Sequence, residues 1–142
     1  MTADPVARLP FDSLGRGDVL PPFSLALSAA DVRAYLQATG EPAEHWSELV
    51  PPLMLIARMI GGLLERIEIP DRLLHAGQEF EMQRALRIDE AAEIRFSVTS
   101  LGTRGGAVMA SFGIDAVAEG GESVATARAS VVVPPAGEGP AT

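Results

Sequence analysis

The central feature of the chain is the sequence VPPLMLIARMIGGLLERI, residues 50–67. From Leu53 to Ile67 apolar side chains recur at spacings of three and four residues, which predicts a helix. Further apolar side chains fall between these positions, so we expect the helix to be buried on most of its sides. Pro52 suits the first helical turn, where a proline costs no hydrogen bond. Gly61 and Gly62 each cost about 1 kcal/mol relative to alanine, which indicates the close approach of another backbone or a local break.

Downstream of this helix the hydrophobic pattern changes to a period of two, which predicts strands. The four predicted strands span residues 74–83, 91–101, 108–114 and 122–133. Glycine-containing turns at 103–106 and 119–122 are typical of hairpins. The last strand has small and β-branched residues on both faces, so we expect it to lie inside the sheet with both faces covered.

Upstream of the central helix, a shorter helix is indicated by its capping residues. Ser28 is followed by Asp31 at the spacing of a capping box. We therefore predict a short amphipathic helix at about 29–39, ended by Gly40. Residues 41–50 that follow are polar around one large aromatic side chain and are expected to form a loop.

With 142 residues the chain has the length of one domain. Residues 1–20 are expected to be irregular, and a short strand is expected at 23–27. Helices followed by a run of strands indicate an α+β class. The simplest arrangement is a long central helix wrapped by a curved antiparallel sheet of about five strands. We place a lead-in at 1–10, the domain at 11–135 and a flexible tail at 136–142.

Composition excludes several classes of function. The chain contains no Cys and no Lys, which excludes thiol nucleophiles, disulfides, Cys-based metal sites and Schiff-base or phosphate-loop lysines. The formal net charge is −8 and no basic run is present, so we expect no binding to nucleic acid. His45 and His75 are the two histidines, which leaves few groups able to move protons at neutral pH.

The sequence also predicts a protein away from membranes. Residues 1–10 lack the basic start and long apolar stretch of a secretory signal. The longest mostly apolar stretch, residues 49–64, falls short of the roughly 20 residues needed to span a bilayer. We therefore expect a cytoplasmic protein with no membrane partner.

Four stretches of the chain carry a resemblance to a known family. They are Gly17–Pro22, Asp31–Pro42, Leu49–Leu55 and His75–Arg84, followed by a closing strand that ends at Val133–Pro134. In this order and spacing the chain resembles the MaoC-like dehydratases, which have the hotdog fold, and within them the FAS1-like, N-terminal MaoC branch. The likeness covers most of residues 11–135.

The resemblance implies a lyase of fatty acid or polyketide metabolism. Relatives add water to trans-2-enoyl thioesters to form (3R)-hydroxyacyl thioesters, or catalyse the reverse dehydration. The acyl chain enters along the central helix, and its carrier is coenzyme A or acyl carrier protein. An acid–base pair moves the proton, and backbone N–H groups at the start of the central helix polarise the thioester oxygen. The resemblance implies neither a metal nor a cofactor.

The motif that carries the acid–base pair in the family is altered here. Active relatives place an Asp and a His five residues apart in Gly-Asp-x-Asn-Pro-x-His, whereas residues 40–46 read Gly-Glu-Pro-Ala-Glu-His-Trp. Glu41 takes the Asp position, Trp46 takes the His position, and His45 comes one residue early. A shift of one residue moves a functional atom by up to about 3.5 Å. Glu41 and His45 are the catalytic candidates, and the alternatives are a plain turn residue and a solvated loop histidine.

The candidates for contact with substrate are Trp46, Pro51, Pro52, Leu53, His75 and Gln78. Trp46 could form the wall of an acyl or pantetheine pocket or anchor its loop on the fold. His75 and Gln78 could line a cleft from one strand or serve that strand structurally. The three remaining residues are the entry to the central helix, where the resemblance places the thioester.

Three functions remain open from the sequence. The first is an enoyl-thioester hydratase or 3-hydroxyacyl-thioester dehydratase that uses Glu41 and His45. The second is a non-catalytic, acyl-binding hotdog subunit of a heteromeric dehydratase. The third is a hotdog thioesterase, in which an acid activates water against the carbonyl carbon. In each case the resemblance implies a homodimer, or a heterodimer with another hotdog subunit.

Overall fold

The computed structural model describes residues 7–135, in which five strands form one antiparallel sheet. In chain order the elements are β1 (Leu9–Pro10), the 3-10 turn η1 (Phe11–Ser13), β2 (Val19–Leu25), α1 (Ala29–Thr39), the 3-10 turn η2 (Ala43–Trp46), α2 (Pro52–Leu64), β3 (Ile67–Glu68), β4 (Leu74–Met82), β5 (Ala92–Arg104), β6 (Ala107–Ala118) and β7 (Ser123–Val133). The strand order is β2-β5-β6-β7-β4, so β2 and β4 are the edges. The α+β class and the sheet of five strands are confirmed. Residues 1–6 and the expected flexible tail at 136–142 lie outside the described residues.

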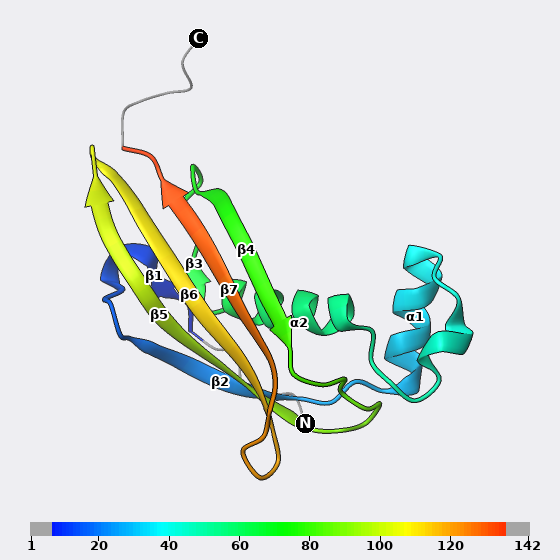
Figure 1. Cartoon of the computed structure of the whole chain (residues 1–142). Helices are drawn as coiled ribbons and strands as arrows, with labels where there is room; N and C mark the ends of the chain where they lie inside the picture. The colour runs from blue at the N-terminus through cyan, green and yellow to red at the C-terminus, as the bar shows by residue number, and fades with distance from the viewer. Residues whose placement is uncertain (1–6, 136–142) are drawn as a thin grey trace.

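The helices lie on one side of the sheet (Figure 1). Helix α2 runs across that face, and α1 with η2 lies beyond the N-terminal end of α2, away from the strands. Strand β7 is inside the sheet, between β6 and β4, as its sequence predicts. Because one helix covers this face, the core lies between α2 and the sheet.

Helix α1 spans the predicted residues because both of its ends are set by local contacts. The Asp31 N–H donates to the Ser28 hydroxyl oxygen at 3.1 Å, and the Ser28 N–H donates to the Asp31 carboxylate at 3.0 Å. These hydrogen bonds from Ser28 lower the pKa of Asp31. Gly40 ends the helix with φ at +76°, a conformation that glycine adopts without strain.

Strand β2 begins earlier than the sequence predicts. It starts at Val19 and passes through two prolines between Leu20 and Phe23, where its register against β5 shifts. Proline is tolerated at this position because an edge strand leaves one side of its backbone unpaired. The expected irregular conformation of residues 1–20 and the expected strand at 23–27 are therefore wrong in their boundaries.

Helix α2 is shorter at its C-terminal end than predicted. It ends at Leu64, and Ile67 instead belongs to β3. Strand β3 pairs in parallel with Leu9–Pro10 of β1. The apolar pattern continues past the helix because Ile67 stays buried after the chain leaves the helix.

The prediction that α2 is buried on most of its sides is wrong. Its sheet-facing side is buried, but Leu53 is 56 % exposed and Leu64 is 42 % exposed. The physical reason is that the sheet covers one face of the helix, and no second layer formed by residues 7–135 covers the other. Among the described residues no helix is long and apolar enough to cross a membrane.

Gly62 allows α2 to approach two aromatic rings. A Cβ atom at this position would overlap the Phe23 ring and would lie 3.0 Å from Cζ of Phe96. The two rings are stacked, with centroids 6.0 Å apart. The close approach therefore involves aromatic side chains rather than the backbone expected from the sequence, and the helix continues through Gly61 and Gly62.

Candidate functional site

Of the predicted acid–base residues, Glu41 lies between α1 and η2, and His45 lies in η2. The α1 region lies beyond the N-terminal end of α2, away from the strands (Figure 1). Glu41 and His45 are both exposed. Trp46 is half-buried and packs against the hydrophobic core. The structure thus places the two candidates on the same loop ahead of α2, with their side chains in solvent and with Trp46 as the residue that contacts the fold.

The start of α2 holds the candidates for the thioester end of the substrate. The N–H groups of Met54 and Leu55 both donate to the Pro51 carbonyl, at 3.1 and 3.2 Å. Pro52 has no N–H group. Within the described residues, the N–H of Leu53 is therefore the helix-end donor left without a backbone acceptor. A donor at a helix N-terminus can polarise a carbonyl oxygen.

A cavity of about 370 Å³ lies between the C-terminal half of α2 and the sheet. Its lining residues are Ile60, Leu63, Leu64, Ile67, Ile69, Leu73, His75, Gln78, Phe112, Ala129 and Val131. All but His75 and Gln78 are apolar. This combination of an apolar wall and a few polar groups is typical of small-ligand sites.

A bulge in β4 brings His75 and Gln78 to the same face. Along a regular strand, residues three positions apart point to opposite faces. Here the register against β7 shifts between His75 and Gly77, so one residue of β4 is extra. His75 then lies opposite Val131 and Gln78 lies opposite Ala129, and both of these β7 residues line the cavity.

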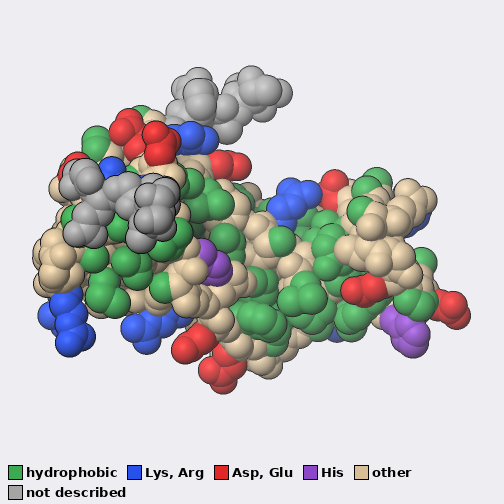
Figure 2. Space-filling model, turned by 90° about the horizontal axis from the view of Figure 1, so that it is seen from above, with side chains coloured by type: hydrophobic (Ala, Val, Ile, Leu, Met, Phe, Trp, Pro, Cys, Tyr) green, Lys and Arg blue, Asp and Glu red, His purple; other side chains and the backbone are tan. Residues whose placement is uncertain are grey.

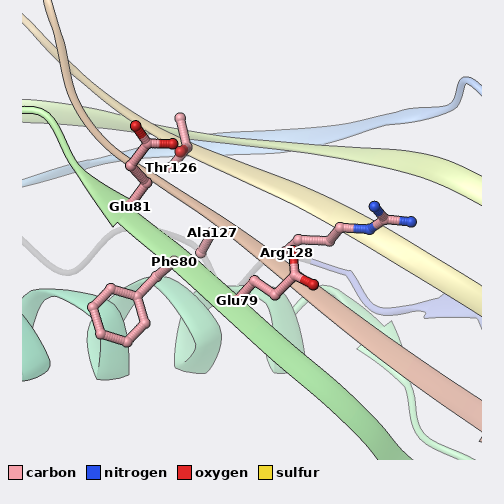
Figure 3. A pocket seen from close by; sticks show the side chains of 6 residues that line it. All are labelled: Glu79, Phe80, Glu81, Thr126, Ala127 and Arg128. Carbon is pink, nitrogen blue, oxygen red and sulfur yellow. The ribbon is translucent and has the colours of Figure 1, made fainter.

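A second, shallower hollow of about 250 Å³ lies on β4 and β7 (Figure 3). The Phe80 side chain points to the side of β4 on which α2 lies, whereas Glu81, Thr126 and Arg128 lie on the opposite side. Phe80 is 46 % exposed, although it is on the apolar face, because β4 is an edge strand. The edge therefore presents an aromatic ring on one face and carboxylates on the other.

Apolar side chains are exposed along the middle of the molecule, between the sheet and the α1 region (Figure 2). The large ones on α2, β4 and the segment between them are Leu53, Leu64, Ile69, Leu74 and Phe80. They come from the elements that surround the cavity. An exposed apolar area of this kind marks a contact surface or a ligand site.

The turn between β4 and β5 is held by one ionic cluster. Arg84 and Glu90 form an ion pair at 2.6 Å, and Arg84 also pairs with Glu122 at 3.0 Å. The hydrogen bonds from Arg84 lower the pKa of Glu90 to about 2, and the two carboxylates raise the pKa of Arg84. The cluster lies outside the cavity lining and has a structural explanation, because the Glu90 carboxylate also accepts the Arg87 N–H.

Sequence reasoning missed most of the cavity. Ile60, Leu63 and Leu64 read as a generic apolar helix face, and Phe112 and Val131 read as strand core. Only His75 and Gln78 were singled out, since they are polar residues in an alternating strand. Among residues 7–135, no group of three or more His, Asp or Glu side chains is arranged to hold a metal ion. That the chain needs no cofactor stays a prediction.

No protein-family model matches the chain, and no curated protein matches it in sequence. Solved structures do match it. The (R)-hydratase of A. caviae involved in PHA biosynthesis is 22% identical with a TM-score of 0.66, over 87% of this chain and 98% of the hydratase. The MaoC-like dehydratase of Rhodospirillum rubrum is 18% identical with a TM-score of 0.73, over 89% of this chain and 97% of the other.

The C-terminally truncated HadBC complex of Mycobacterium tuberculosis, a 3R-hydroxyacyl-ACP dehydratase, also matches. It is 14% identical with a TM-score of 0.64, over 82% of this chain and 96% of the matched chain. The chain therefore has the hotdog fold, which confirms the fold that the sequence resemblance implies. The FAS1-like branch stays a prediction.

Proposed function

We propose that the chain is an acyl-thioester-binding hotdog subunit that acts in the hydration of enoyl thioesters or the dehydration of (3R)-hydroxyacyl thioesters. The observation that carries the proposal is the cavity of about 370 Å³ between α2 and the sheet, whose lining is mostly apolar. An acyl chain buried there gains about 0.8 kcal/mol per CH₂ group. The hydratases and dehydratases of the same fold support the reaction class.

Helix α2 contributes to both parts of an acyl-thioester site, the contact with the thioester and the pocket for the acyl chain. The Leu53 N–H at its start is positioned to donate to a thioester oxygen, and the cavity begins at Ile60. About 10 Å of helix separates these two residues. A thioester at the N-terminal end of α2 could therefore extend its acyl chain along the helix into the cavity.

The acid and base are proposed to come from a partner subunit. Glu41 and His45 are exposed, and within the described residues neither belongs to the cavity lining. Strand β4 is an open edge of the sheet, and its neighbourhood exposes apolar side chains. An unpaired edge next to an apolar surface favours strand pairing with a second chain. A homodimer or a heterodimer with another hotdog subunit would cover it, and in the heterodimer the other subunit would supply the acid and base.

A second candidate is catalysis within this chain by Glu41 and His45. The observation in its favour is that both residues lie on the loop that leads into α2. Closure of that loop over the start of α2 would be needed to bring them to the substrate. A hotdog thioesterase remains a further alternative, with the same acyl cavity.

Binding and turnover should be measured on the purified chain with trans-2-octenoyl-CoA. We expect binding by calorimetry and no loss of enoyl absorbance, with hydration appearing only when a catalytic hotdog partner is added. Hydration by the chain alone that disappears in His45→Ala would instead establish the second candidate. Release of free thiol would establish the thioesterase.

The cavity can be tested with a matched pair of substitutions. Val131 and Val117 are both half-buried sheet residues, but only Val131 lines the cavity. Val131→Trp should fill the cavity and weaken acyl-CoA binding at least tenfold, whereas Val117→Trp should leave it unchanged. Equal affinities in the two variants would contradict the proposed acyl site.

A further inference from the structure

The bulge in β4 delivers hydrogen-bonding groups into an otherwise apolar cavity. His75 and Gln78 both reach the cavity because the register shifts between His75 and Gly77. Among the described residues, neither side chain is hydrogen-bonded to the protein. A regular β4 would turn His75 to the opposite face of the sheet and leave a cavity with a single polar group.

These two groups would need partners once the cavity is filled. Both residues are exposed, so water has access to their polar groups. A bound chain displaces that water, and a purely aliphatic chain offers no hydrogen bond in return. A polar group that loses water without gaining a partner weakens binding. A ligand with a suitably placed polar group avoids this loss.

The chemistry of the lining favours a neutral polar group over an ionised one. A neutral imidazole offers one donor and one acceptor, and the Gln78 amide offers donors and an acceptor. A hydroxyl group can use both kinds of partner. The cavity lining contains neither Arg nor Lys, so a carboxylate there would have no permanently charged partner, and burying it would cost more than burying a hydroxyl.

We propose that the cavity selects acyl chains that carry a hydroxyl group along the chain, with His75 and Gln78 as the residues that recognise it. This inference rests on the proposed acyl-binding function and adds the class of acyl chain. The two residues act on specificity, and they are separate from the acid–base chemistry at C2 and C3.

The test compares decanoic acid with hydroxydecanoic acids that carry the hydroxyl at each position from mid-chain to the ω carbon. Binding to the full chain is measured by displacement of a fluorescent fatty acid. One good hydrogen bond is worth about tenfold in affinity, so we expect at least one hydroxydecanoic acid to bind about tenfold more tightly than decanoic acid. His75→Leu and Gln78→Met should each reduce this preference while decanoic acid binds as well or better.

Gln83→Met is the control, because it makes the same change just beyond β4 and outside the cavity lining. It should keep the preference of the unmodified protein, and thermal melting should show that all three variants are folded. If decanoic acid binds as tightly as every hydroxydecanoic acid, selection by His75 and Gln78 is wrong and the acyl site stands. If none of the acids binds, this inference fails, and the calorimetry with trans-2-octenoyl-CoA decides whether the proposed function fails with it.

Discussion

The guanidinium carbon of Arg66 lies 4.9 Å from the centroid of the Phe96 ring, and it lies equally close to the ring of Phe23. Arg66 is 2% exposed. It donates to the carbonyl of Pro21 and, at 2.9 Å, to the carbonyl of Gly62. One buried cation thus joins the end of α2 to edge strand β2, and burial lowers the pKa of Arg66.

Replacing Arg66 should destabilise the fold. Arg66→Leu leaves the Pro21 and Gly62 carbonyls without this donor, and hydrogen bonds to a charged group are worth about 1.5–3 kcal/mol. The substitution also removes the desolvation cost of a buried charge, which offsets part of this loss of stability. We expect a net decrease of about 2 kcal/mol in the free energy of unfolding, measured in urea, and a smaller decrease for Arg66→Lys. A Leu variant as stable as the unmodified protein would show that the cation contributes nothing.

The two adjacent glycines of α2 should respond in opposite directions. Gly62→Ala forces a methyl group against Phe23 and Phe96, and overpacking of this kind costs about 1–3 kcal/mol. At Gly61 a Cβ would meet nothing within 4 Å, so Gly61→Ala should gain up to about 1 kcal/mol from helix propensity. Thermal or urea unfolding of the two variants measures both effects. A gain in stability for both variants would mean that the rings of Phe23 and Phe96 can move aside.

Loss of the Arg84–Glu90 ion pair should appear at acid pH. The pKa of Glu90 is lowered from 4.5 to about 2, so its contribution to stability is complete above pH 4.5 and is lost as the pH falls towards 2. After allowance for solvent screening of this partly exposed pair, Glu90→Gln should lower the free energy of unfolding by about 1–2 kcal/mol at neutral pH, and the difference should shrink steadily below pH 4.5. Urea unfolding at a series of pH values gives the comparison.

Glu122 provides the control for that experiment, since it also pairs with Arg84 but its side chain is 62% exposed. An exposed ion pair is worth about 0–1 kcal/mol. Glu122→Gln should therefore have a small effect at every pH. If Glu122→Gln lowered the free energy of unfolding as much as Glu90→Gln does, the Arg84–Glu90 pair would not be the main stabilising contact of the cluster.

Assembly should depend on the β4 edge. Phe80 on β4 is 46% exposed and Val19 on the opposite edge strand β2 is 76% exposed. A charge on an edge strand opposes pairing, so Phe80→Lys should give a folded monomer in sedimentation velocity, and Val19→Lys should keep the assembly of the unmodified protein. If Phe80→Lys assembles like the unmodified chain, the contact lies on another surface.

The structure follows the sequence most closely where contacts are local. Helix α1 has the predicted bounds because Ser28 and Asp31 cap it and Gly40 ends it. The hairpins at Gly105–Gly106 and Gly120–Gly121 form as predicted, with φ positive at all four glycines. The predicted start of β2 is wrong because the strand contains two prolines, which do not suggest a strand in the sequence. The prolines are tolerated because β2 is an edge strand, and its position in the sheet is a property of the tertiary structure.

The candidate site was only partly predictable for the same reason. The alternation of residues 74–83 shows a strand, but period-two reasoning places His75 and Gln78 on opposite faces. The bulge that unites them arises from pairing with Val131 and Ser130, which lie more than fifty positions along the chain. The α+β class, the hairpins and the cap of α1 follow from contacts within a few residues, so the sequence by itself determines them. The cavity, the exposed side of α2 and the burial of Arg66 depend on the register between distant strands, which packing sets only when the whole chain has folded.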